Sequence, residues 1–235
     1  MKTQTETPIV QLKDVSKIYQ QGKIEVKAVD RLSLDIQRGD FAALCGPSGS
    51  GKTSVLNLVG GLDVPSSGEV WVDQINLATL SASALSNVRK NRIGFVFQAY
   101  NLIPVMTAYE NAEFVLNLQG VDESERHDRV MTILKEVGLE GLEKRRPDEM
   151  SGGQQQRVAI ARAIVTQPAI ILADEPTANV DSRTAESLLD LMQALNQEKG
   201  ITFLFSTHDQ HVMDRARRLI RLLDGRLESD EVRGA

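Results

Sequence analysis

The chain has 235 residues, of which 41% are hydrophobic and 25% are charged, and its formal net charge is −5 at pH 7. This composition is typical of a globular protein with a sizeable core and excludes wholesale disorder. The acidic balance argues against nucleic-acid binding, and the single cysteine excludes an internal disulfide and a cysteine-rich zinc site. No stretch approaches the roughly 20 apolar residues of a membrane span, and the start of the chain lacks the apolar region of a secretory signal, so we expect a cytoplasmic protein.

Strands and turns are predicted for the first 40 residues. Apolar and polar residues alternate over 32–37, which is typical of a half-buried strand, and the short apolar run 41–45 predicts a fully buried strand. A helix is expected over 52–59, and two further strands are expected over 69–72 and 92–97.

The segment 99–167 differs from its surroundings, because apolar residues recur there at helical spacing among many charged residues. We expect it to be mainly helical. Short apolar strands follow at 170–173 and 203–205, with a helix near 182–198 between them, and an Asp-Gly turn predicts a hairpin over 222–227. Apolar strands that alternate with helices indicate a parallel sheet covered on both faces.

The strongest local motif is Gly-Pro-Ser-Gly-Ser-Gly-Lys-Thr at 46–53, which matches the P-loop pattern G-x-x-x-x-G-K-[ST]. Glycines let the backbone wrap closely around phosphate, and the N–H groups at a helix start point at the anion. Lys52 supplies a positive charge for the β and γ phosphates, and the Thr53 hydroxyl suits Mg²⁺. The motif lies between a predicted strand and a predicted helix, as a P-loop requires.

A second motif lies where the apolar strand 170–173 ends in Asp174 and Glu175. Strands often end in acidic turn residues, so this pattern is weak alone and becomes strong beside a P-loop. Asp174 is expected to hold Mg²⁺ through water, and Glu175 to polarise an attacking water.

The third motif is Met-Ser-Gly-Gly-Gln-Gln-Gln-Arg at 150–157. Ser151 is a good N-cap, and Ser-x-x-Gln fits a capping box, which explains the motif locally. Two glycines at a helix start also expose a second set of N–H donors for an anion. Two phosphate-binding helix starts with one acidic strand end suggest that two chains share each nucleotide.

With these three motifs in this order, the sequence resembles the ATPase subunits of ABC (ATP-binding cassette) transporters over about residues 8–228. The resemblance implies an α/β fold: a P-loop NTPase parallel-sheet core with an N-terminal antiparallel β-subdomain and an inserted helical subdomain. It implies one domain over 1–235. Residues 1–98 and 168–235 would form the core with the β-subdomain, and 99–167 the helical subdomain with the third motif.

The resemblance also implies roles for individual residues. It implies catalytic roles for Lys52, Gln98, Glu175 and His208, and an Mg²⁺ site at Thr53, Gln98 and Asp174. It implies that ATP is bound by Tyr19, which would stack on adenine, and by Gly46, Ser48, Gly49, Ser50, Gly51, Lys52, Thr53, Ser54, Ser151, Gly152, Gly153 and Gln154. Taken alone, Tyr19 would be a packing residue, Gln98 a strand-end residue and His208 a loop histidine.

Within that family, the segments 56–63, 94–98 and 101–104 resemble the LolD and MacB group. The group implies an ATP-dependent head-to-tail dimer of two copies. It also implies a separate FtsX/MacB-like permease that docks beside residues 98–106, including Tyr100, Leu102 and Met106. The protein would then lie at the cytoplasmic face of the inner membrane and power the export or extraction of a lipophilic substrate.

Other readings of the motifs predict different functions. A mechanical or regulatory ABC ATPase that drives a periplasmic partner without moving a solute would have the same site residues, so motifs alone leave this alternative open. A soluble ABC ATPase of DNA repair or translation would normally carry coiled coils, zinc modules or a second cassette. A P-loop kinase or GTPase would leave the 150–157 motif unexplained, and the sequence has no NKxD guanine-reading motif.

Overall fold

The computed structural model of the protein describes residues 7–22 and 24–233. The first six residues, part of the region expected to lack a secretory signal, lie outside this range. The strands are β1 (Val10–Gln21), β2 (Ile24–Ile36), β3 (Phe41–Cys45), β4 (Ser67–Val72), β5 (Ile75–Asn76), β6 (Ile93–Phe97), β7 (Ile170–Asp174), β8 (Phe203–Ser206), β9 (Arg218–Leu223) and β10 (Arg226–Val232). The helices are α1 (Lys52–Val59), α2 (Ala82–Arg92), α3 (Ala108–Gln119), α4 (Glu123–Glu136), α5 (Gly152–Ile164), α6 (Ser182–Lys199) and α7 (Gln210–Arg215), with short 3₁₀ turns η1 (Leu77–Thr79) and η2 (Pro147–Glu149).

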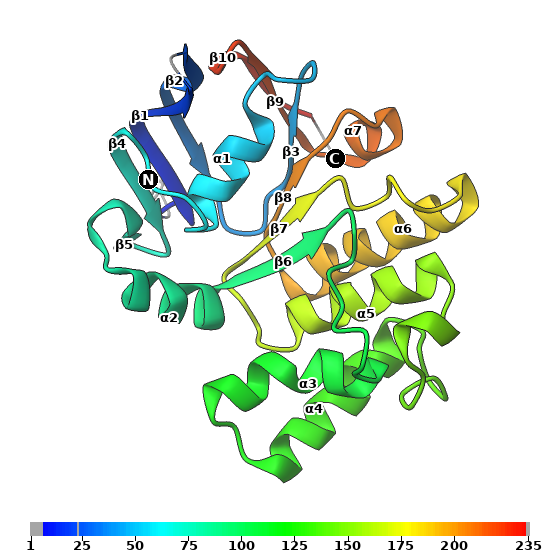
Figure 1. Cartoon of the computed structure of the whole chain (residues 1–235). Helices are drawn as coiled ribbons and strands as arrows, with labels where there is room; N and C mark the ends of the chain where they lie inside the picture. The colour runs from blue at the N-terminus through cyan, green and yellow to red at the C-terminus, as the bar shows by residue number, and fades with distance from the viewer. Residues whose placement is uncertain (1–6, 23, 234–235) are drawn as a thin grey trace, which may run out of the picture.

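The strands form two sheets (Figure 1). The larger has the order β10-β9-β3-β8-β7-β6, and its neighbours are parallel except at the edge hairpin β9–β10. The smaller has the order β2-β1-β4-β5 and is antiparallel throughout. The expected fold class, a parallel-sheet core beside an N-terminal antiparallel sheet, is confirmed.

The central strands of the large sheet are apolar on both faces. In β3, Phe41 and Ala43 belong to one buried cluster, whereas Ala42 and Leu44 belong to a second cluster. Successive side chains of a strand point to opposite faces, so each face needs its own cover. Helices α5, α6 and α7 contribute to the first cluster, and α1 with the small sheet contributes to the second. Helix α1 therefore lies between the two sheets, as Figure 1 shows.

The segment 99–167 contains α3, α4, η2 and α5, as its helical spacing predicted. Helix α3 packs on both α4 and α5, and α5 packs on β6 as well, so α5 joins this segment to the core. That residues 99–167 behave as one subdomain stays a prediction. Among the residues that the structure describes, every helix is too short or too polar to cross a bilayer.

Most predicted elements are confirmed with bounds within a few residues, and β3 and α1 match theirs. The hairpin at Asp224-Gly225 is also confirmed, with both turn residues at positive φ (49° and 76°), as a tight hairpin requires. Helices α2 and α7 were not predicted. In α2 only Leu85 and Val88 are buried, which leaves almost no hydrophobic period to detect.

Candidate functional site

The loop between β3 and α1 has a backbone that only glycine accommodates at two points. Gly46 and Gly51 have φ values of 142° and 99°, in the region that favours glycine. A Cβ on Gly46 would lie 2.2 Å from the Leu222 carbonyl oxygen, and one on Gly51 would lie 2.3 Å from that of Ala28. The loop is therefore pressed against its neighbours, and its shape depends on the glycines of the P-loop pattern.

The start of α1 could hold an anion. Its N-cap, Gly51, provides no side-chain cap, and its first turn holds no acidic residue, so the N–H groups and the positive end of the helix dipole are free for a ligand. Lys52 is 9% exposed, and its Nζ donates to the carbonyl oxygens of Gly46 (2.8 Å) and Pro47 (3.0 Å). The Ser50 hydroxyl, which is 2% exposed, has no hydrogen-bond partner among the described residues. A phosphate group would supply the acceptor that this hydroxyl and these N–H groups lack.

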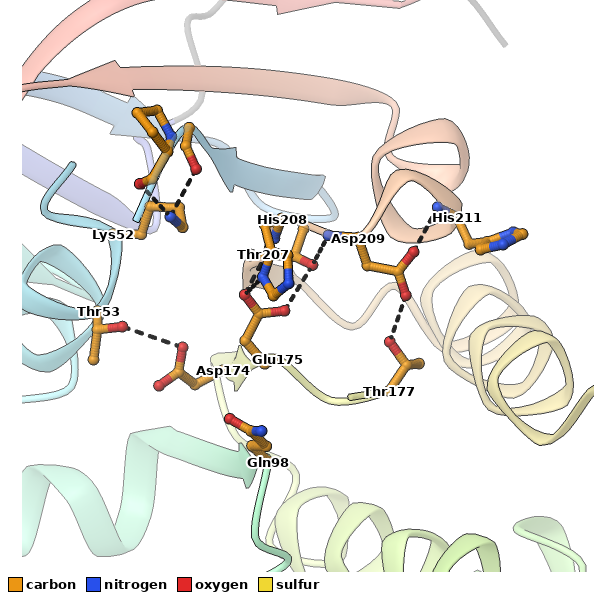
Figure 2. Close-up of polar contacts among 12 residues, drawn as sticks. Lys52, Thr53, Gln98, Asp174, Glu175, Thr177, Thr207, His208, Asp209 and His211 are labelled. Atoms are coloured by element: carbon orange, nitrogen blue, oxygen red, sulfur yellow. Dashed lines mark hydrogen bonds and ion pairs between the residues drawn. The ribbon is translucent and has the colours of Figure 1, made fainter. Parts of the chain in front are cut away.

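Asp174 ends β7 opposite the start of α1. The Thr53 hydroxyl donates to Asp174 Oδ1 at 3.5 Å, so the structure brings together these two oxygen-bearing side chains (Figure 2). Burial raises the pKa of Asp174 above its usual value of 3.8, and the neighbouring Glu175 charge adds to this. A hydrogen bond from Ser206 and the positive charge of Lys52 oppose the rise.

The next residue, Glu175, faces the segment that follows β8. Its Oε1 lies 2.5 Å from His208 Nδ1 and accepts from the His208 backbone N–H at 3.1 Å, while its Oε2 accepts from the Thr207 hydroxyl at 3.1 Å (Figure 2). Because a carboxylate only accepts hydrogen bonds, the short contact places the histidine proton on Nδ1. Glu175 also has a φ of 45°, which is uncommon for a residue other than glycine and often marks functional sites.

Parallel pairing explains why these side chains meet. Strands β7 and β8 are neighbours, and the Glu175 backbone N–H donates to the Ser206 carbonyl oxygen at 2.9 Å. The segments that follow the two strands therefore start side by side at the carboxyl edge of the sheet, beside the P-loop that follows β3. Ligands of open α/β sheets bind at this edge.

Gln98 directly follows β6 at the same edge. Its closest polar contacts are with Asn179: the Gln98 Nε2 donates to Asn179 Oδ1 at 3.5 Å, and the Asn179 Nδ2 donates to the Gln98 carbonyl oxygen at 3.0 Å. In Figure 2 the Gln98 side chain points from the end of β6 toward Asp174 and Glu175.

The start of α5, unlike that of α1, has a side-chain cap. Ser151 and Gln154 form a reciprocal capping box: the Gln154 N–H donates to Ser151 Oγ at 3.3 Å, and the Ser151 N–H to Gln154 Oε1 at 2.9 Å. A Cβ on Gly153 would lie 2.4 Å from Thr184 Cγ2, so α5 begins against the start of α6. Within residues 7–22 and 24–233, no hydrogen bond joins residues 151–154 to the P-loop. The structure therefore does not bring these residues to the P-loop of the same chain through a polar contact.

Tyr19 lies on β1 with its hydroxyl already bonded. It donates to Asp63 Oδ2 at 2.9 Å, Lys17 Nζ bonds the other oxygen of Asp63 at 2.5 Å, and that ammonium lies 4.9 Å from the Tyr19 ring centroid. Burial raises the pKa of Tyr19, and a hydrogen bond from Ser54 on α1 opposes the rise. Tyr19 thus borders the first turn of α1.

Sequence reasoning assigned no function to Thr177, Thr207 and Asp209, which connect the segments around Glu175. Asp209 accepts from the Thr177 hydroxyl at 3.2 Å, its N–H donates to the Thr207 hydroxyl at 2.9 Å, and its carboxylate caps α7 at the N–H of His211. The only sequence signal for them was their position beside Glu175 and His208.

A cavity of about 600 Å³ lies at the other edge of the sheet. Its lining includes Ile133 of α4, Ala169 just before β7 and Thr202 just before β8. The cavity lies at the amino ends of β7 and β8, whereas the site residues follow the carboxyl ends of the same strands. The length of these strands therefore separates the cavity from the site.

Comparisons with known proteins agree with the geometry. A profile of the family described as ABC transporter matches residues 29–178. The ABC transporter ATP-binding protein MJ0796 of Methanocaldococcus jannaschii is 44% identical over 227 residues, which cover 95% of this chain and 97% of that protein. A solved dimeric structure of MJ0796 in a post-hydrolysis state bound to ADP and Pi has a TM-score of 0.88 and covers 96% of this chain and 100% of its own.

The macrolide export ATP-binding/permease protein MacB of Syntrophobacter fumaroxidans is 42% identical over 224 residues. These cover 94% of this chain but 31% of MacB, so this chain spans about a third of that relative. An ABC transporter ATP-binding protein of Thermotoga maritima is 42% identical and is covered over 96% of its length.

Proposed function

The chain is a member of the ABC transporter family of ATP-binding proteins and is an ATPase, and we propose that it hydrolyses ATP as a head-to-tail dimer that powers a separate membrane permease. The observation that carries this proposal is the meeting of an uncapped, lysine-bearing P-loop with the Asp174-Glu175 strand end at one edge of the sheet. Catalysis of phosphoryl transfer depends on positioning and electrostatic stabilisation, which this edge can supply.

Each segment at the edge has its own task in the proposal. Residues 46–54 hold the phosphates of ATP through backbone N–H groups, with Lys52 balancing their charge. Glu175 orients an attacking water and accepts its proton. Its carboxylate is already held in place by the hydrogen bond from His208, in the segment after β8. His208 also contacts the γ-phosphate, and Tyr19 stacks on adenine next to the first turn of α1.

The site also suits a magnesium ion. Thr53, Gln98 and Asp174 would hold it, because hydroxyl, amide and carboxylate oxygens are the donors that Mg²⁺ prefers, and Thr53 and Asp174 already lie within 3.5 Å. When bound, Mg²⁺ neutralises charge that develops on the transferred phosphate. Burial of Asp174 favours a bound cation, since a cation offsets the cost of ionising this carboxyl.

The position of residues 151–154 supports the proposed dimer. Among the described residues, these four make no hydrogen bond to the P-loop of their own chain, so we propose that they close over the nucleotide of a second copy. The dimeric solved structures of MJ0796, at 43% and 44% identity, support this arrangement. The γ-phosphate then holds the two copies together, and hydrolysis releases them.

The permease is proposed to dock on the segment that follows Gln98, with residues 99–167 moving as one helical subdomain. Exposed apolar side chains occur in this segment and in the helix that follows it. Val105 is 73% exposed, and Phe114 and Leu118 lie one turn apart on α3 with 36% and 56% exposure. The MacB relatives carry ATP-binding and permease functions in one chain, which supports an FtsX/MacB-like permease, export or extraction of a lipophilic substrate, and a place at the cytoplasmic face of the inner membrane. A mechanical or regulatory ATPase that drives a periplasmic partner remains the second candidate, and nucleic acid is not a proposed partner.

The variant Glu175→Gln tests this proposal. The amide keeps the shape of the side chain but accepts no proton, so we expect ATP binding to persist and turnover to fall by about 100-fold or more. With ATP and Mg²⁺ the variant should elute as a stable dimer in size-exclusion chromatography with light scattering. Glu198→Gln makes the same change at an exposed position on α6 and should behave like the wild type.

Turnover by Glu175→Gln at the wild-type rate would refute the role of Glu175. Purification of this variant from detergent-solubilised membranes then tests whether the chain works with a membrane permease. A co-purifying permease with few spans and a large extracytoplasmic domain supports the MacB-like assignment, whereas recovery of a soluble dimer alone contradicts it.

A further inference from the structure

The Tyr100 side chain crosses between segments that are far apart in the sequence. Its hydroxyl donates to the carbonyl oxygen of Asn179 at 2.9 Å, whereas the family resemblance implied that Tyr100 lines the permease groove. Asn179 lies in the segment 177–181, which follows Glu175 and leads into α6. The tyrosine therefore ties the segment after β6 to the segment after β7.

A second pair of contacts joins the same two segments. The side chain of Asn179 bonds the backbone and the side chain of Gln98. Gln98 and Asn179 are thus hydrogen-bonded to each other, and Tyr100 is hydrogen-bonded to the backbone of Asn179. These three residues form one bridge across the edge of the sheet.

The backbone of Tyr100 is itself held in an uncommon shape. Tyr100 and Asn101 have φ values of 58° and 49°, a conformation that residues other than glycine rarely adopt. The guanidinium of Arg162 on α5 donates to both of their carbonyl oxygens, at 2.9 Å and 2.6 Å. Arg162 stabilises the turn that directs the tyrosine ring toward Asn179.

The start of α5 completes the arrangement. A Cβ on Gly152 would lie 2.7 Å from the Tyr100 hydroxyl oxygen and 3.4 Å from the Asn179 carbonyl oxygen. The missing side chain at Gly152 therefore leaves the space in which the hydroxyl meets the carbonyl. The phenol lies where three segments of the proposed site converge.

We propose that Tyr100 is a positioning residue, whose hydroxyl fixes the segment 177–181 relative to Gln98 and to the start of α5. The inference rests on the proposed function, because the segment begins two residues after Glu175 and its placement sets that of the carboxylate during turnover. Tyr100 transmits a displacement of the Gln98 segment to Glu175 without contacting the substrate.

Tyr100→Phe removes the hydroxyl and keeps the ring, and Tyr109→Phe is the matched control. Tyr109 is a half-buried tyrosine on α3 beside His127, outside the bridge. We expect Tyr100→Phe to speed amide hydrogen exchange in residues 177–181 of the nucleotide-free chain. The kcat for ATP hydrolysis should fall about three- to tenfold with KM unchanged, as expected for one hydrogen bond that acts only on turnover. Tyr109→Phe should change neither quantity.

Three outcomes would overturn the inference. Unchanged amide hydrogen exchange and unchanged kcat would show that the hydroxyl does not stabilise the segment 177–181. Faster exchange with unchanged kcat would make the contact merely structural, and a lower kcat with unchanged exchange would mean that the effect bypasses the segment. A wild-type chain without ATPase activity would refute the proposed function instead, and the exchange measurement would then show whether the hydroxyl holds the segment at all.

Discussion

Asp174 and Glu175 are consecutive acids with different surroundings. Glu175 accepts three hydrogen bonds from Thr207 and His208, whereas Asp174 is partly buried and its pKa is raised chiefly by that burial. An acid whose pKa is raised on folding stabilises the folded state less as the pH rises through that pKa, because the unfolded chain ionises at lower cost. The ionised Asp174 thus destabilises the chain when no cation is bound.

We therefore predict that Asp174→Asn raises the thermal midpoint of the nucleotide-free chain at about pH 7 in EDTA. The amide oxygen still accepts the Thr53 hydroxyl, and the cost of burying a charge is removed. The difference from the wild type should shrink as the pH falls through the raised pKa of Asp174 and disappear below the ordinary pKa of aspartate, where both folded chains are uncharged at this position. Asp35→Asn, at an exposed position on β2, is the control, and an equal gain there or a gain independent of pH would contradict the explanation.

At the level of elements, the two phosphate-binding helix starts of the proposal differ in construction. Helix α1 has no cap, while α5 has a complete capping box. A ligand can therefore replace missing bonds at α1, but at α5 it must add to bonds that are already made. This difference fits a primary site at α1 and a closing contact from α5 of a second copy.

The close approach of α5 to α6 gives a prediction for Gly153. Gly153→Ala should lower the free energy of unfolding by about 1–2 kcal/mol, because the new Cβ would lie 2.4 Å from Thr184 Cγ2. Thr184→Ser removes that methyl group and keeps the hydroxyl that bonds Asp181. In urea unfolding the double variant should recover most of the loss. Additive losses in the double variant would show that Thr184 is not the obstacle.

At the level of the whole molecule, the docking surface can be tested away from the active edge. Leu102, which the sequence placed in the permease groove, is partly buried and packs against the core cluster, so a charge there would also destabilise the fold. Val105 is 73% exposed and is the better position for a charge. The prediction that Leu102 lines the groove stays a prediction.

In the Glu175→Gln background, Val105→Asp should abolish co-purification of the permease and leave the thermal midpoint and ATP binding unchanged. A carboxylate in an apolar contact is costly because it loses water without gaining a partner. Val232→Asp makes the same change at a 79% exposed position on β10 and should retain the permease. Equal retention by both variants would exclude Val105 from the docking surface.

Motifs made of neighbouring residues were predictable because their geometry is local. The P-loop, the strand that ends at Asp174 and the capping box at Ser151 each depend on a few consecutive residues, and β3 and α1 follow from short-range hydrophobic pattern. Helix α2 was missed because it buries so few side chains. This helix forms because of its packing on the rest of the chain and not because of a hydrophobic period of its own.

The contacts among Glu175, His208, Gln98, Asn179 and Tyr100 depend on strand order, which no local pattern encodes. Pairing of β7 with β8 and of β6 with β7 brings residues 33 to 81 positions apart to one edge of the sheet. The sequence by itself thus predicted which groups would bind phosphate, because that ability would reside in a loop and the helix start beside it. The packing of distant segments decided which carboxylate His208 bonds and which carbonyl oxygen accepts the Tyr100 hydroxyl. Those contacts form only when the strands lie side by side.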